Sequence, residues 1–260
     1  MSILKKSSNL IILFVILLIP ILIEGFICKP NIFDYARKSY NFCNTIFFLG
    51  FWEENGFVEN IQSLFLFLSI FFLIKAKFLY KNISLINYFL LIKIFALFYY
   101  LGEEISWGQH FFNWSSPEWF IKNNNQSETN LHNISNLFDQ LPRSLVIVWC
   151  IFSAPITLVF KKLKFFEENF IKILCPNKYL IFISILLLIF VLPDLIVSKL
   201  DLFPPYLNQT SDLIPTPNND ALLYQFITFN IFRLSELHEL IFSFYFLFYS
   251  LSISKIFIND

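Results

Sequence analysis

The chain contains six stretches of mostly apolar residues, each about long enough to cross a lipid bilayer as a helix. Hydrophobic residues make up 57% of the 260 and Phe alone occurs 36 times, which is well above the level of a soluble domain of this length. The sequence therefore predicts an all-α fold, a polytopic membrane helix bundle that forms a single domain over 1–260. The predicted spans are about 8–27, 57–74, 83–105, 144–160, 179–197 and 234–256.

The first and last stretches each leave an alternative. The first follows Lys5 and Lys6, as a signal peptide would, but its apolar run is long and no small-x-small cleavage site follows it, so we interpret it as an anchor. Residues 221–257 are too long for one span. We expect an interfacial or re-entrant helix at 221–232 before the sixth crossing, and two short helices, giving seven crossings, are the alternative.

The basic residues predict that both termini are cytoplasmic. In that orientation the short inner segments carry eleven lysines, whereas the much longer outer loops carry six basic residues. The outer loops would be 28–56, 106–143 and 198–220. Cys28 and Cys43 share the first of them, where an oxidising compartment would permit a disulfide. The formal net charge is zero, so charge gives no reason to expect a nucleic-acid partner, and membrane lipids are the expected surroundings.

Four polar segments fall on the predicted outer side. Ionisable groups at membrane depth are costly unless they have partners, so carboxylates and histidines at the same ends of several helices predict a common polar site. The segments are FWEENGFVEN at 51–60, GEEISWGQH at 102–110, NNNQSETNLHNISN at 123–136 and RLSELHEL at 233–240.

Helical geometry assigns these side chains to faces. If the third helix continues past the membrane boundary, Glu103, Ser106 and His110 share one face, and Glu104 shares another with Lys93. Lys93 is about 16 Å from Glu104 along the axis, so we expect it to meet a group on another helix or to line a polar cavity. The alternative, snorkelling of Lys93 to the interface, is awkward from mid-span.

Acid–base chemistry by paired carboxylates is the favoured chemistry, because burial or a like charge can raise one pKa while the other group stays ionised. A Ser106 nucleophile is the alternative, although GEEISWG lacks the G-x-S-x-G elbow. A structural ion pair is the alternative role for Arg233 and Glu236. The candidate catalytic residues are Glu103, Glu104, Glu128, His132, Glu236 and Glu239. Candidate supporting or substrate-binding residues are Glu54, Glu59, Ser106, Trp107, Gln109, Gln126, Asn130 and Arg233.

A divalent metal such as zinc is a further hypothesis, because all three histidines lie close to glutamates. No H-E-x-x-H, C-x-x-C or Glu-x-x-His spacing occurs, and a loop histidine more often donates a hydrogen bond than binds a metal. Glu128 and His132 would meet on a helix, and an irregular loop is the alternative. The candidate ligands are His132, Glu104, Glu128, His110 and His238.

These motifs resemble those of a group of uncharacterised bacterial multi-pass membrane proteins with E-E-I-S-W-G-Q followed by N-x-Q-x-E-x-N-L-H-N. An acidic segment like that from Trp52 to Glu59 and a final-helix E-x-x-E, here Glu236 and Glu239, are similar too. The group has arginine at the position of His110, which argues against His110 as a ligand. The resemblance implies a shared polar site in a bacterial inner membrane without naming its reaction. The chain shares only the types of its polar residues with alkaline ceramidase-like membrane hydrolases, so that comparison is an analogy and not a family resemblance.

Two functions remain open. The first is a membrane hydrolase or transferase whose site faces outside and acts on a lipid or a lipid-linked glycan. The second is a non-catalytic transport or assembly protein, in which Lys93, Arg233 and the glutamates form an ion path or lock the bundle. An ion path needs polar groups that reach the inner side, and the sequence offers almost none below Lys93, so we favour the enzyme.

Overall fold

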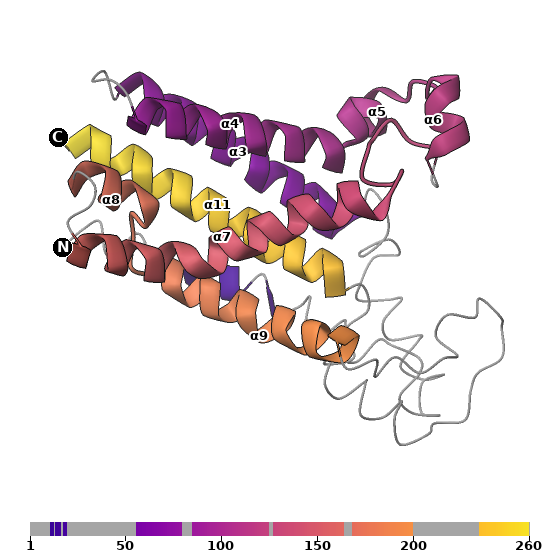
Figure 1. The fold of residues 1–260 in the computed structure, drawn as a ribbon. Helices are drawn as coiled ribbons and strands as arrows, with labels where there is room; N and C mark the ends of the chain where they lie inside the picture. The colour runs from indigo at the N-terminus through magenta and orange to yellow at the C-terminus, as the bar shows by residue number, and fades with distance from the viewer. Residues whose placement is uncertain are drawn as a thin grey trace. The chain divides into compact units, whose positions relative to one another are not determined.

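The structure is a computed structural model that describes part of 11–19, together with 56–79, 85–124, 127–163, 168–199 and 234–259. Every regular element in these ranges is a helix, which confirms the all-α prediction (Figure 1). The elements are α3 (Phe57–Leu79), α4 (Leu85–Glu104), η1 (Ser106–Gly108), α5 (Gln109–Phe112), α6 (Glu118–Asn123), α7 (Asn136–Leu163), α8 (Glu168–Leu174), α9 (Leu180–Lys199) and α11 (Leu234–Asn259).

Four of the described helices are long and apolar enough to cross a membrane, as a multi-pass protein requires. The segments are Phe57–Leu79, Leu85–Glu104, Leu141–Leu163 and Glu236–Ile256, which match four of the six predicted spans. The predicted first span is helical at its described positions within 11–19. In α9 the described apolar run, Leu180–Leu192, is shorter. Six crossings and the orientation therefore stay predictions, and 221–232, Cys28 and Cys43 lie outside the described residues.

The chain divides into two compact units. One consists of 1–51 and 188–238, and its described parts are helical positions within 11–19, the end of α9 and the start of α11. The other consists of 52–187 and 239–260 and contains α3, α4 and the segments up to α8. The remainder of α11 also belongs to this second unit, which holds the contacts described below.

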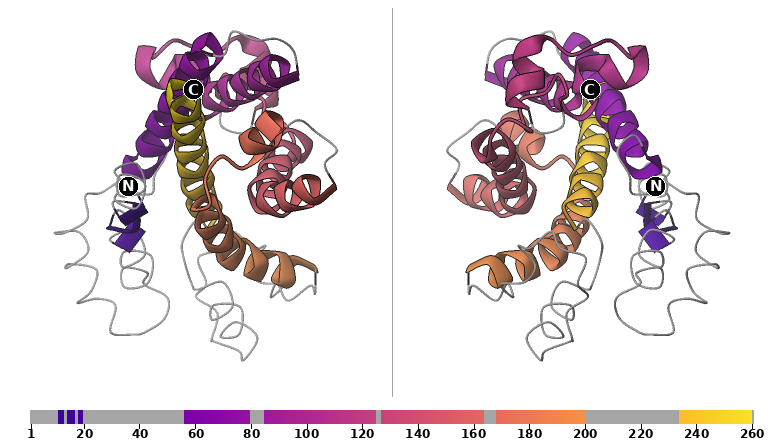
Figure 2. Two further views of the ribbon diagram at one scale, coloured as in Figure 1. Left: turned by 90° about the vertical axis from the view of Figure 1, so that its left-hand side faces the viewer. Right: turned by 90° about the vertical axis from the view of Figure 1, so that its right-hand side faces the viewer.

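In the second unit α11 is the central helix, and α3, α4, α7 and α8 surround it (Figures 1 and 2). Phe244 of α11 packs on Phe65 of α3 with ring centroids 5.6 Å apart. Tyr245 and Tyr249 of α11 are fully buried, and their hydroxyls contact α7 and α8. Tyr245 Oη lies 2.5 Å from Ser153 Oγ of α7, and Tyr249 donates to the carbonyl of Ile173 in α8. These bonds satisfy two polar groups that lipid could not.

The outer surface of α4 is apolar in the manner of a lipid-facing helix. Tyr88, Ile92 and Phe95 are about two-thirds exposed, whereas Leu90 and Leu97 are buried against the bundle. Water would make such an exposed stripe unfavourable, but a bilayer does not, because lipid tails are themselves apolar. The surface of α4 therefore agrees with its length in indicating a transmembrane helix.

Two helix ends bear on the predictions. The third span, predicted at 83–105, matches α4, which ends at Glu104; a tight turn follows, so the helical faces considered for Ser106 and His110 do not arise. The fourth span begins earlier than predicted, because α7 starts at Asn136 and continues through Pro142 and Pro155. Proline is tolerated in a transmembrane helix where neighbours or side chains satisfy the freed backbone groups.

Candidate functional site

The turn after α4 has an unusual backbone. Ser106, Trp107 and Gly108 have φ angles of 46°, 54° and 96°, so three successive residues are in the left-handed region. Only glycine adopts this region without strain, and each non-glycine residue there costs about 1 kcal/mol or more. The turn therefore persists because surrounding contacts enforce it, and such strain is found most often at functional sites.

Trp107 makes the first of these contacts by folding back onto the end of α4. Its indole N–H donates to Glu103 Oε1 at 2.9 Å. Its ring lies flat enough on Gly102 that a Cβ at that position would be 2.9 Å from the ring atom Cε3. Glycine is required at 102 because the indole occupies the space of a side chain.

We expect Gly102→Ala to lower the free energy of unfolding by about 1–3 kcal/mol, because the new methyl group displaces the indole and its hydrogen bond to Glu103. The measurement is thermal unfolding of the detergent-purified protein. Ser115→Ala, on the exposed part of the same loop, is the control and should change stability by less than about 0.5 kcal/mol. Since both changes act on one contact, Gly102→Ala should add little to Trp107→Ala, and full additivity would contradict the explanation.

Glu103 connects the turn to the second polar motif. Its side chain is almost fully buried, and Oε2 accepts hydrogen bonds from the backbone N–H groups of Leu131 at 2.6 Å and His132 at 2.9 Å. Nδ1 of His132 is 3.6 Å from the same oxygen. With Trp107 on Oε1, the carboxylate has donors on both oxygens. A buried carboxylate satisfied in this way holds the segment around 131–132 against the end of α4.

Ser106 and Glu128 form the second contact between the two motifs. Ser106 Oγ donates to Glu128 Oε2 at 2.6 Å. The side-chain amide of Asn130 donates to both partners, at 2.9 Å to Ser106 Oγ and 2.7 Å to Glu128 Oε2. Asn124 in turn donates to the carbonyl and the side-chain oxygen of Asn130. Ser106 and Asn130 are buried, whereas Glu128 is partly exposed.

Gln109 forms a third contact, at the start of α5. Its side-chain oxygen accepts from the backbone N–H of Thr129 at 2.8 Å, and its amide donates to Ser116 Oγ at 2.9 Å. Ser116 donates to the carbonyl of Ser127, a residue whose φ of 57° is also left-handed. We call the three contacts together, centred on Glu103, Ser106–Glu128 and Gln109, the loop network.

The loop network brings together about half of the sequence-predicted site. It contains Glu103, Ser106, Trp107, Gln109, Glu128, Asn130 and His132. Glu104, Glu59 and Glu236 are partly exposed at the ends of α4, α3 and α11. Glu54, Gln126, Arg233 and the side chain of His110 lie outside the described residues.

Glu239 was predicted to act at the polar site, and the structure pairs it with Arg143 of α7. The side chains are 8% and 25% exposed, so this ion pair between α7 and α11 is largely buried. Sequence reasoning missed the role of Arg143. The signal was an arginine beside a proline at the start of an apolar span, which alone does not identify a partner 96 residues away.

The metal hypothesis gains nothing from the described residues, in which no three His, Cys, Asp or Glu side chains are grouped as a metal site requires. Glu128 and His132 lie in an irregular segment and not on a helix, so their predicted i, i+4 contact does not arise in that form. Glu128 is engaged by Ser106 and Asn130, and His132 lies beside Glu103. His238 is buried on α11.

Chemically, the network combines a hydroxyl, a carboxylate and an amide in direct contact. A carboxylate 2.6 Å from a serine hydroxyl is placed to accept its proton, which is the role of a general base toward a nucleophile. Comparison with known proteins adds no further guide: no protein-family model, curated protein or solved structure matches the chain.

Proposed function

We propose that the protein is a membrane hydrolase or transferase that acts on a lipid or a lipid-linked glycan, with Ser106 as nucleophile and Glu128 as general base. The observation that carries this proposal is the 2.6 Å hydrogen bond from Ser106 Oγ to Glu128 Oε2, made from a strained left-handed backbone. Strain of this kind is maintained where side-chain direction matters, as it is for a nucleophile.

The proposed reaction is acyl transfer through a covalent intermediate. Ser106 Oγ attacks the carbonyl carbon of an ester while Glu128 accepts the hydroxyl proton, and the same proton passes to the departing alcohol. Water or an acceptor hydroxyl then releases the acyl group and restores both side chains. Asn130 orients the pair, because its amide contacts both reacting oxygens. Since Ser106 is buried, the segment that carries Glu128 must move to admit substrate.

The lipid substrate class is supported by the surface next to the network. Four aromatic side chains of α5, α6 and their connection are between 41% and 76% exposed: Phe111, Phe112, Trp114 and Trp119. Aromatic residues gather at the boundary between lipid and water, where the headgroups lie. We also propose that this boundary is the outer face of a bacterial inner membrane, which the distribution of lysines supports.

A fluorophosphonate probe, which reacts with nucleophilic serines, tests the proposal on the detergent-purified full chain. We expect labelling at Ser106 that is abolished by Ser106→Ala and falls about 100-fold or more in Glu128→Gln, since general bases contribute about 10²–10⁴-fold. Ser115→Ala, which changes an exposed serine of the same loop, should label like the wild type. Equal labelling of Ser106→Ala and wild type would refute the enzyme.

A non-catalytic assembly role is the second candidate. It is favoured by the hydrogen bonds of Glu103, whose two carboxylate oxygens both have donors. Two backbone N–H groups and an indole occupy its oxygens, as in a structural lock that joins the loop to α4. Under this alternative, Ser106→Ala and Glu128→Gln lower thermal stability but no probe labels Ser106. Labelling of a stably folded wild type therefore separates the two functions.

A further inference from the structure

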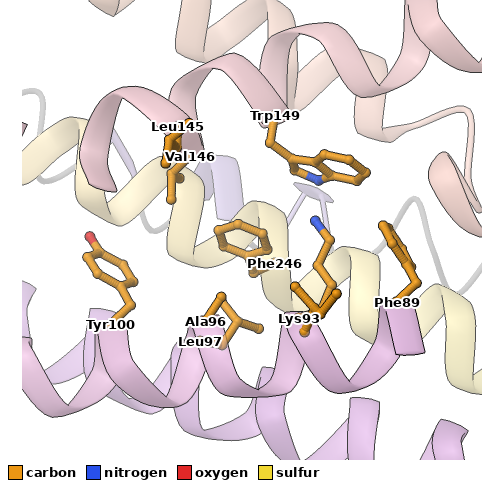
Figure 3. Close-up of a pocket in the computed structure, with 10 residues that line it drawn as sticks. Phe89, Lys93, Ala96, Leu97, Tyr100, Leu145, Val146, Trp149 and Phe246 are labelled. Atoms are coloured by element: carbon orange, nitrogen blue, oxygen red, sulfur yellow. The ribbon is translucent and has the colours of Figure 1, made fainter. Parts of the chain in front are cut away.

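A cavity of about 290 Å³ lies between α4, α7 and α11, and none of its lining residues belongs to the loop network. Its wall is mostly apolar, and Lys93 of α4 is the basic side chain that lines it. Figure 3 shows the Lys93 ammonium pointing across the cavity toward the indole of Trp149 on α7, with Phe246 of α11 beside it. The sequence predicted that Lys93 meets a group on another helix or lines a polar cavity. In the structure it meets Trp149 of α7, and the cavity is mostly apolar.

Aromatic rings surround the ammonium group of Lys93. Its Nζ is 3.2 Å from the ring centroid of Trp149 and between 5.3 and 5.6 Å from the centroids of Tyr249, Phe89 and Phe246. Ring faces attract a cation, and they do so most strongly where water is excluded. The rings therefore offset part of the cost of placing an ammonium group inside the bundle.

Within the described part of the chain, the ammonium group of Lys93 forms no ion pair with a carboxylate. The indole N–H of Trp149 is also buried there without an acceptor. Two donors on one cavity that lack an acceptor leave a substantial desolvation penalty, which an anionic ligand would remove.

The depth of Lys93 restricts what kind of anion can reach it. Lys93 follows Leu85 by about 12 Å and precedes Glu104 by about 16 Å along α4, so it lies near the middle of the span. Phospholipid headgroups stay at the surface of the bilayer, about 15 Å from its centre. A single-chain amphiphile has no such constraint, since its small head can enter the protein while its apolar body remains in an apolar environment.

We propose that this cavity binds a single-chain amphiphile with a carboxylate head, which pairs with Lys93 Nζ and accepts the N–H of Trp149. The apolar body lies against the cavity wall formed by Ala96 and Leu97. Ile92 and Leu145 at the cavity are 67% and 63% exposed on the outer surface, so a longer chain continues past them into the lipid. The site is independent of the proposed hydrolase or transferase.

The test is a titration of the full-length protein in neutral detergent with dansyl-labelled undecanoic acid, and with the corresponding dansyl-labelled alcohol. A charge-assisted contact with two donors predicts that the acid binds about 10-fold or more tightly than the alcohol. Lys93→Gln should remove that difference. Lys178→Gln is the matched control, because Lys178 also lies over an aromatic ring, at 5.5 Å from the centroid of Tyr179, but outside the cavity.

Three results would overturn the inference. Equal binding of acid and alcohol by the wild type would show that Lys93 does not bind the carboxylate. This comparison needs only the wild type, so it tests the inference even if Lys93→Gln does not fold. Undiminished binding of the acid by folded Lys93→Gln would place the acid elsewhere. Displacement of the acid by phosphatidylglycerol at equal concentration would assign the site to a phospholipid headgroup instead of a single-chain carboxylate.

Discussion

Glu103→Gln is expected to lower the free energy of unfolding by about 3 kcal/mol. The carboxylate accepts the backbone N–H groups of Leu131 and His132 on one oxygen and the indole of Trp107 on the other. A glutamine has one acceptor oxygen, so its NH₂ group must face one set of donors. Either orientation places N–H against N–H in a buried position and removes the charge that strengthens these bonds.

Thermal unfolding in detergent, followed by tryptophan fluorescence, measures this loss. Glu118→Gln is the matched control, because Glu118 is on α6 beside the network but its ion pair with Lys122 is 3.9 Å long and almost wholly exposed. That pair should contribute less than about 1 kcal/mol. If the two substitutions changed the melting temperature equally, Glu103 would not hold the loop as the structure indicates.

The helical architecture could be predicted from sequence because membrane crossing depends on length and apolarity. Four predicted spans coincide with helices of the described chain to within a few residues at most ends. The left-handed turn that follows α4 could not be predicted in the same way. Only Gly108 signals a left-handed turn, since serine and tryptophan rarely adopt positive φ. Here Ser106 is held by Glu128, which is distant in sequence, and Trp107 is held by Glu103 on the preceding turn.

The grouping of the two long motifs was also predictable, but the roles within the group were not. Glu103 and Glu128 were both predicted to be catalytic, and the structure gives them separate partners: backbone N–H groups for one, and Ser106 with Asn130 for the other. A sequence shows which residues can form hydrogen bonds. It does not show which of them face backbone donors across a loop of more than twenty residues.

The ion pair between Arg143 and Glu239 shows the same limit at longer range. Its members are 96 residues apart, and the composition around each predicts only that a charge near a span needs a partner. The sequence pointed instead to an ion pair between Arg233 and Glu236. Packing of α7 against α11 decides the pairing, and packing follows from the shapes of side chains along both helices and not from any local motif.

Arg143→Met is expected to destabilise the second unit by about 3–5 kcal/mol, because it leaves the buried carboxylate of Glu239 without its cation. Glu239→Leu should have an effect of similar size, because it removes the carboxylate that Arg143 contacts across the two helices. The measurement is again thermal unfolding in detergent, with limited proteolysis to report whether α7 separates from α11. Each single variant should be cleaved faster than wild type.

The double variant Arg143→Met, Glu239→Leu measures the interaction between the two side chains apart from the contribution of each one alone. Replacing a buried ion pair by apolar side chains of similar volume is often neutral or stabilising, because neither charge has to be removed from water or lipid headgroups. We therefore expect the double variant to recover most of the stability that either single variant loses, giving a strongly non-additive cycle. The exposed pair of Lys122 and Glu118 should give additive changes near zero. Additive losses at Arg143 and Glu239 would mean that each side chain stabilises the bundle through other neighbours, and that α7 and α11 do not depend on their mutual attraction.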